Sequence, residues 1–313
     1  MKKYLFLLPL LFLWSCQTPS SCSPRAAAEK LPVICINDDG SIENSSELNA
    51  YCKQIAKTPQ TVVVFIHGWH GTASPPDGNI RAFMENLEKV RTRSFQPAGR
   101  TLTGIAITWR ARTLRGLLET PAYYRTRARA DKISRADGVA EALAKLADSM
   151  RKGTKEHMIV GGHSMGARIL GRVIRKHPEL LKTVDLVLLA NTADSASSFR
   201  RTLDSVDQHP YPRGRLPKLV WVTSAHDIFT RIIYPPFNGG AAPGHDHGVI
   251  TYDVELEKTS TQPPYYSAHI EQVSKYPNHY AHDIRITKGW GGHSDIWNEA
   301  MNQIVNYYVL RGN

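Results

Sequence analysis

The chain has 313 residues, of which 42% are hydrophobic and 21% charged. It can therefore bury a sizeable core, and its composition excludes a globally disordered protein. No internal period marks a solenoid, a collagen or a coiled coil. The net charge is +11, from 39 basic and 28 acidic residues. A charge of this size is compatible with an anionic surface or with nucleic acid, but it selects neither of them.

The chain begins with the pattern of an export signal. Two lysines precede a short apolar run, Tyr4–Trp14. The length of this run fits the apolar region of a signal peptide and falls well short of the ~20 residues that span a bilayer as a helix. We therefore predict a signal peptide over residues 1–15 and an exported protein.

The apolar run ends in Leu-Trp-Ser-Cys, which resembles the lipobox of bacterial lipoproteins. Trp14 departs from the small residue that is usual at its position. The resemblance implies that Cys16 carries a lipid and anchors the protein to a membrane of the cell envelope, at the periplasmic or outer-membrane face. A plain secretory cleavage, which would release a soluble protein, is the alternative. Residues 16–30 are rich in Ser, Pro and Ala, so we expect a polar tether there.

All four cysteines lie in the first sixth of the chain. With Cys16 lipidated and Cys22 on the tether, Cys35 and Cys52 remain for the folded part. Because an exported protein meets an oxidising compartment, we predict a disulfide between Cys35 and Cys52. No CxxC or Cys/His spacing typical of zinc sites occurs, so we expect no metal site built on cysteine.

From about residue 60 the sequence alternates between apolar runs rich in β-branched residues and amphipathic segments. The runs predicted as strands are 62–66, 102–109, 157–161, 184–190, 219–223 and 284–287, and the predicted helices are 80–90, 139–150, 165–173 and 294–310. Continuous apolar runs are typical of parallel strands that are covered on both faces. We therefore predict an α/β domain over residues 31–313 with a doubly wound, mostly parallel sheet.

Two stretches interrupt this alternation. Residues 110–137 carry eight basic and three acidic side chains, and residues 228–282 are rich in Pro, Gly, Tyr and His without a clear period. We predict that both are insertions at the loop ends of the sheet, where α/β enzymes carry lids and pocket walls. The basic stretch fits a surface for anionic lipid or acidic substrate, or a solvated face with ordinary ion pairs. Nucleic acid is not an expected partner, because no binding motif is present.

A candidate nucleophile lies where the strand ending at residue 161 meets a helix. Residues 162–166 read Gly-His-Ser-Met-Gly. This G-x-S-x-G pattern places Ser164 on a sharp, strained turn, and its glycines let the strand and the helix approach closely. The N-terminus of the following helix favours negative charge that develops nearby.

Further segments supply the groups that such a nucleophile needs. The strand at 62–66 leads into His-Gly-Trp, where the backbone N–H of Trp69 would bind an oxyanion together with the N–H of Met165. Downstream, predicted strands lead into Asp227 and His293. The chain order Ser164, Asp227, His293 is the serine–acid–histidine order of hydrolases with this motif.

The sequence offers a second candidate for the catalytic acid and for the catalytic histidine. Asp194 follows the strand at 184–190, where some lipases carry their acid, so it stays an alternative to Asp227. His282 precedes the last predicted strand whereas His293 follows it, which favours His293. The other histidines near the motif or in the second insertion are interpreted as structural, pocket-lining or loop residues rather than metal ligands: His67, His70, His163, His245 and His247.

Over roughly residues 60–310 the chain resembles the α/β-hydrolase superfamily, within the broad esterase, lipase and serine aminopeptidase-like group. The segment Gly292–Trp297 also resembles the region around the catalytic histidine in uncharacterised bacterial hydrolases of this type. The resemblance implies acyl hydrolysis without a metal or a cofactor. It does not imply a substrate, because one fold hosts many functions.

Together these features predict an exported serine hydrolase that cleaves a small-molecule carboxylic ester through an acyl-enzyme intermediate. Ser164 would attack the acyl carbon, His293 would take and return its proton, and Asp227 would orient the imidazole. A thioesterase or amidase is an alternative within the enzymes. A non-catalytic envelope protein that keeps the fold for binding or scaffolding is the alternative outside them.

Overall fold

The computed structural model describes residues 32–69, 78–111, 119–152, 157–208, 219–233, 252–258, 266–272, 281–288 and 292–294, with the single residues 235, 242, 296 and 301. The predicted signal peptide, Cys16 and the tether lie outside these residues. So do His70, His245 and His247 and most of the predicted last helix. Within the described part, no helix combines the length and the apolar character needed to cross a membrane.

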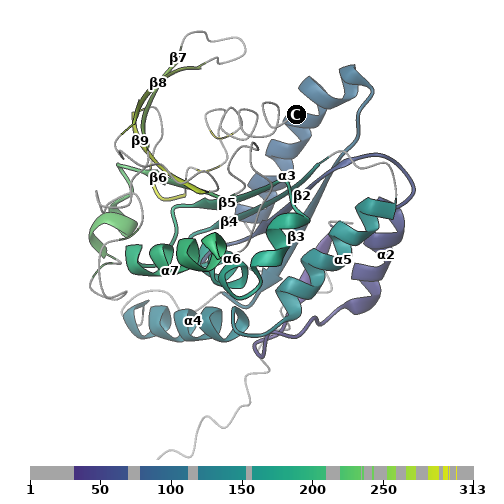
Figure 1. Ribbon diagram of the computed structural model, residues 1–313, viewed down its shortest axis with the longest axis horizontal. Coiled ribbons are helices and arrows are strands. Elements are labelled where there is room, and N and C mark those ends of the chain that lie inside the picture. The colour runs from purple at the N-terminus through teal and green to yellow at the C-terminus, as the bar shows by residue number, and fades with distance from the viewer. Residues whose placement is uncertain are drawn as a thin grey trace, which may run out of the picture.

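A single sheet runs through the described residues (Figure 1). Its nine strands follow the order β1-β3-β2-β4-β5-β6-β9-β7-β8. Every described pair of neighbours is parallel except β7 with β8. The strands are β1 Val33–Ile36, β2 Thr61–Ile66, β3 Leu102–Trp109, β4 Met158–His163, β5 Leu186–Ala190, β6 Leu219–Ser224, β7 Tyr252–Lys258, β8 Tyr266–Gln272 and β9 Ala281–Lys288.

Helices cover both faces of the sheet. The described helices are α2 Ser45–Ile55, α3 Gly78–Val90, α4 Glu119–Ile133, α5 Gly138–Lys152, α6 Met165–Lys176 and α7 Ala196–Asp207. Residues of α2, α4, α5, α6 and α7 belong to one hydrophobic cluster, and residues of α3 belong to the clusters on the other face. The predicted α/β class, with a doubly wound and mostly parallel sheet, is confirmed.

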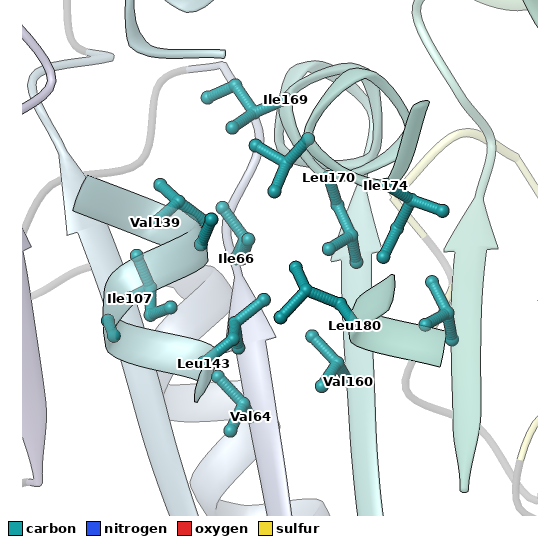
Figure 2. Close-up of a cluster of buried hydrophobic side chains, with 14 of the residues drawn as sticks. Val64, Ile66, Ile107, Val139, Leu143, Val160, Ile169, Leu170, Ile174 and Leu180 are labelled. Carbon is teal, nitrogen blue, oxygen red and sulfur yellow. The ribbon is translucent and has the colours of Figure 1, made fainter. Parts of the chain in front are cut away.

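The larger cluster fixes the central strands against α5 and α6 (Figure 2). Val64 and Val160 point from β2 and β4 toward Leu143 of α5 and Leu170 of α6. All four side chains are buried, and burying one such side chain contributes about 1.5–3 kcal/mol. The amino end of α6 is therefore held rigidly over the carboxyl ends of β2 and β4.

The first predicted insertion is partly regular structure. Residues 119–133 form α4, which packs against α6. Its buried apolar residues are few, Ala122, Tyr123, Ala130 and Ile133, and they lie among basic residues, so the sequence shows little helical amphipathicity. The second predicted insertion contributes β7 and β8, which extend the sheet beyond β9.

The predicted disulfide between Cys35 and Cys52 is wrong. Cys35 is disulfide-bonded, but Cys52 is a free thiol. Successive side chains of a strand point to opposite faces of the sheet. Cys35 lies with Ile80 of α3 on one face, whereas Cys52 of α2 packs against the cluster on the other face. The sheet itself separates the two sulfur atoms.

Candidate active site

Ser164 occupies the turn between β4 and α6. Its φ is +53° and its ψ is −116°, a conformation that residues with a side chain rarely adopt. Three backbone hydrogen bonds hold it. Ser164 N–H donates to the carbonyl of Ala190 at 3.0 Å, and the carbonyl of Ser164 accepts the N–H groups of Arg168 at 3.0 Å and Ala193 at 3.1 Å. Such a conformation costs on the order of 1–3 kcal/mol and persists only where its surroundings enforce it.

The two glycines of the motif allow the close approach that the sequence predicts. A Cβ on Gly166 would lie 2.2 Å from the carbonyl oxygen of Ile66 and 2.5 Å from that of His67. A Cβ on Gly162 would lie 2.8 Å from the backbone nitrogen of Ala167. Only hydrogen fits at either position, so the sharp turn requires both glycines.

The structure brings Ser164, His293 and Asp227 together. Nε2 of His293 lies 2.9 Å from Oγ of Ser164, and Nδ1 lies 2.7 Å from Oδ2 of Asp227. Ser164 and Asp227 are buried, and His293 is partly buried. Since Nδ1–H donates to the carboxylate, Nε2 is free to accept the hydroxyl proton of Ser164.

Asp227 is ionised in this site. Burial alone would raise the pKa of Asp227. The hydrogen bond from His293 and the electrostatic attraction of its ring, together with hydrogen bonds from Thr230, outweigh burial and hold the pKa below its ordinary value. The other carboxylate oxygen, Oδ1, accepts the backbone N–H groups of Phe229 at 2.9 Å and Thr230 at 3.2 Å. These bonds fix the carboxylate with one oxygen toward His293.

Asp194, the alternative acid, lies in a different environment. Its carboxylate forms ion pairs with Arg168 at 2.8 Å and with Arg172 at 3.0 Å. Both arginines also form ion pairs with Asp131 of α4. Burial would raise the pKa of Asp194, but the adjacent Arg168 and Arg172 lower it. The structure therefore places Asp194 in a charge network that joins α4, α6 and the loop after β5, and it places Asp227 at His293.

The loop after β2 lies directly against the nucleophile. A Cβ on Gly68 would lie 3.0 Å from Cβ of Ser164 and 3.1 Å from the carbonyl oxygen of His163. Trp69 follows, with its ring partly buried and edge-on to Tyr123 at 5.6 Å. Met165 is the first residue of α6, so its backbone N–H has no acceptor within the helix.

His67 supports this loop. The backbone N–H of Trp109 donates to Nε2 of His67 at 3.2 Å, and the indole N–H donates to the carbonyl of His67 at 3.0 Å. Because Nε2 accepts, the ring proton is on Nδ1, which lies 2.9 Å from the carbonyl oxygen of Gly68. Of the two roles expected from the sequence, structural or pocket-lining, the full burial of His67 and these bonds fit the structural one.

Two buried side chains hold the main chain at His293. Nε2–H of His163 donates to the carbonyl of His293 at 2.8 Å, and the side-chain amide of Asn191 donates to the same oxygen at 2.9 Å. Asn191, at φ +43°, also accepts the backbone N–H of Ser224 at 3.0 Å. Burial lowers the pKa of His163 to about 3, so its ring stays neutral. The role of Asn191 could not be predicted from the sequence, because a single asparagine after a strand is not part of a recognisable motif.

The remaining predictions concern metals and the other histidine. Within the described part of the chain, no group of three or more His, Cys, Asp and Glu side chains is arranged to hold a metal ion. His282 lies near the start of β9, opposite Val220. The Ser–His–Asp cluster lies at the carboxyl ends of the strands, so the backbone position of His282 is at the other end of the sheet.

The strand order, the G-x-S-x-G turn between β4 and α6, and the Ser–acid–His order at the carboxyl ends of the strands define the α/β-hydrolase fold.

No family model and no curated protein sequence matches the chain. The structure is similar to an S-formylglutathione hydrolase from Agrobacterium tumefaciens, at 14% identity over 83% of this chain and 87% of that chain, with a TM-score of 0.41. It is also similar to Est1E from Butyrivibrio proteoclasticus, at 11% identity over 81% and 88%, with a TM-score of 0.39. A third similar structure is LpqC, a poly(3-hydroxybutyrate) depolymerase from Bordetella parapertussis, at 16% identity over 82% and 80%, with a TM-score of 0.40. At these TM-scores the likeness carries no argument about function.

Proposed function

We propose that the protein is a serine hydrolase that cleaves carboxylic esters of small molecules through an acyl-enzyme intermediate. The observation that carries the proposal is the pair of contacts at His293, 2.9 Å to Oγ of Ser164 and 2.7 Å to Oδ2 of Asp227. In this order the imidazole can take the proton of the hydroxyl, and the ionised carboxylate stabilises the imidazolium that forms.

In the acylation step, Oγ of Ser164 attacks the ester carbonyl carbon while Nε2 of His293 takes the hydroxyl proton. The carbonyl oxygen becomes an oxyanion, which the N–H groups of Trp69 and Met165 stabilise. The carbonyl re-forms, the bond to the alcohol oxygen breaks, and His293 gives its proton to the leaving alkoxide. The ionised Asp227 stabilises the imidazolium that exists between these two transfers.

In the deacylation step, a water molecule takes the place of the alcohol. His293 removes a proton from this water, whose oxygen attacks the acyl carbon. The oxyanion forms again beside the same two N–H groups. Oγ of Ser164 then leaves and recovers its proton from His293, so the products are the carboxylic acid and the free enzyme. The balance of these steps needs neither a metal nor a cofactor.

The backbone of Ser164 argues for an enzyme over a non-catalytic scaffold. A binding protein does not need a serine in a conformation that costs on the order of 1–3 kcal/mol, whereas in a hydrolase this turn directs the nucleophilic oxygen toward the acyl carbon. A thioester or an amide could undergo the same steps. We place esters before amides because an alkoxide is a weaker base, and therefore a better leaving group, than an amide nitrogen.

A fluorophosphonate probe tests the proposal directly. The folded wild-type protein should be labelled, and Ser164→Ala should not be labelled. Ser46→Ala, at an exposed serine of α2, is the control and should be labelled like the wild type. A folded wild type that resists the probe and hydrolyses no p-nitrophenyl ester would contradict the enzymatic function.

We also propose, from the sequence, that the protein is exported and held at the cell envelope through a lipid on Cys16. The supporting pattern is the short apolar run that ends in Leu-Trp-Ser-Cys. Mass spectrometry of the mature N-terminus tests this proposal. An unmodified Cys16, or cleavage beyond it, would refute the lipid anchor.

A further inference from the structure

Large apolar side chains are exposed at one place beside the cluster of Ser164, His293 and Asp227. In the part of the chain that the structure describes, the exposed large hydrophobic residues are Tyr124 at 48%, Ile228 at 59%, Phe229 at 42% and Ile232 at 62%. Three of the four follow Asp227 directly, on or next to the π-helical turn Phe229–Ile233. We call Ile228, Phe229 and Ile232 the apolar rim. Apolar groups that gather on a surface mark a site of contact with another molecule.

The apolar rim is fixed to the catalytic geometry. The backbone N–H groups of Phe229 and Thr230 donate to the carboxylate of Asp227, and Arg231 N–H donates to its backbone carbonyl at 3.0 Å. The ring of Phe229 packs on the imidazole of His293, with the ring centroids 5.2 Å apart. The turn that orients the acid therefore also presents the apolar rim beside the general base.

The position next to His293 indicates which part of an ester would contact the rim. In the proposed mechanism the carbonyl oxygen of the substrate faces the N–H of Trp69, in the loop whose Gly68 lies directly against Ser164. The alcohol oxygen must lie at Nε2 of His293, because this nitrogen returns the proton to it. Side chains packed on the imidazole thus stand on the alcohol side of the reacting bond.

We propose that the apolar rim binds the alcohol part of the substrate, so that the protein prefers esters of long-chain or bulky apolar alcohols. This inference rests on the proposed ester hydrolase function. Each methylene of the alcohol that leaves water for the rim would raise kcat/KM by up to about fourfold. An alcohol too short to reach the rim gains nothing from it.

The test uses the full chain and a series of acetate esters: ethyl, butyl, hexyl and octyl acetate. Hydrolysis is followed by the acid released. In the wild type, kcat/KM should rise along the series. In Ile232→Ser and Phe229→Ala, the ratio of octyl to ethyl acetate should fall at least about fivefold, because an apolar contact is lost. Tyr124→Ser, a change of similar exposure on α4, is the matched control and should keep the wild-type ratio.

Four outcomes would overturn the inference. Rim variants that keep the wild-type ratio would show that the rim does not contact the alcohol. A loss confined to the acyl-chain dependence of p-nitrophenyl esters would place the rim on the acyl side. Weaker co-sedimentation of the rim variants with phosphatidylethanolamine–phosphatidylglycerol vesicles, with the alcohol dependence unchanged, would make the rim a lipid-docking surface. No labelling of folded wild type by the fluorophosphonate probe would remove the proposed function itself, independently of any rim variant.

Discussion

Replacing Gly166 by Ala should damage both stability and activity, whereas the same change at Gly171 in the same helix should not. Alanine gains up to about 1 kcal/mol of helix propensity over glycine at either position. A Cβ at position 171 would meet only the flexible end of Leu189, at 3.3 Å. At position 166 it would lie 2.2 Å from the carbonyl oxygen of Ile66, which is backbone and cannot rotate away.

The size of the Gly166→Ala effect follows from these distances. To restore an ordinary contact, the start of α6 has to move roughly 1 Å away from β2, against the packed core of the central strands. Overpacking of this kind costs about 1–3 kcal/mol and outweighs the gain in helix propensity. Because Ser164 precedes α6 directly, the same movement displaces Oγ from His293, and a shift of about 1 Å costs on the order of 10²-fold in rate.

Urea unfolding and p-nitrophenyl acetate hydrolysis measure the two effects side by side. We expect Gly171→Ala to lie within about 1 kcal/mol of the wild type in free energy of unfolding and to keep its activity. We expect Gly166→Ala to be less stable by about 2 kcal/mol and about 10²-fold less active. If Gly166→Ala matches Gly171→Ala in both measurements, the tight turn does not position the nucleophile.

Three further predictions concern the groups around the nucleophile. Asp227→Asn should lower kcat on the order of 10⁴-fold, whereas Asp194→Asn should mainly lower the melting temperature; equal kcat values would refute the assignment of the acid. Asn191→Asp sets a carboxylate oxygen against the carbonyl of His293, so kcat should fall about 10-fold or more with KM nearly unchanged, and a change confined to KM would contradict this. Burial lowers the pKa of His163 to about 3, so as the pH falls the unfolded chain takes up the proton before the folded protein does. The contribution of His163 to stability is therefore fully present above pH ~6.5 and is lost as the pH falls toward about 3. His163→Phe should weaken this acid dependence in urea unfolding, and an unchanged dependence would refute the prediction.

Local patterns were enough to predict the central sheet and the turn at Ser164. The strands β2 to β6 are predominantly apolar, as parallel strands covered on both faces are expected to be. The G-x-S-x-G motif is also local as a pattern, since it lies between one strand and the next helix, although Gly166 makes its tight contact with the end of β2, about 100 residues earlier. The order of Ser164, Asp227 and His293 followed from the strand ends.

Features that depend on contacts between distant segments could not be predicted. The pairing of Cys35 failed because the face of the sheet on which a side chain lies depends on how α2 and α3 pack. The choice between Asp194 and Asp227 stayed open because the arginine partners of Asp194 lie on α6, more than twenty residues before it. The helix α4 was missed because charged residues occur both on its exposed side and on the side that forms ion pairs with α6. Its sequence therefore shows little helical amphipathicity.

The charge network of Arg168, Arg172, Asp131 and Asp194 limits how this sequence can change. Arg168 is almost fully buried and pairs with both carboxylates, so the loss of either one leaves charge without its full compensation. Removing one partner of a buried ion pair costs about 3–5 kcal/mol, whereas replacing the whole set by packed apolar residues is often neutral. We therefore expect stable variants either to keep all four charges or to replace all four together. Substitutions in α4 are thereby coupled to substitutions in α6, the helix that follows the nucleophile.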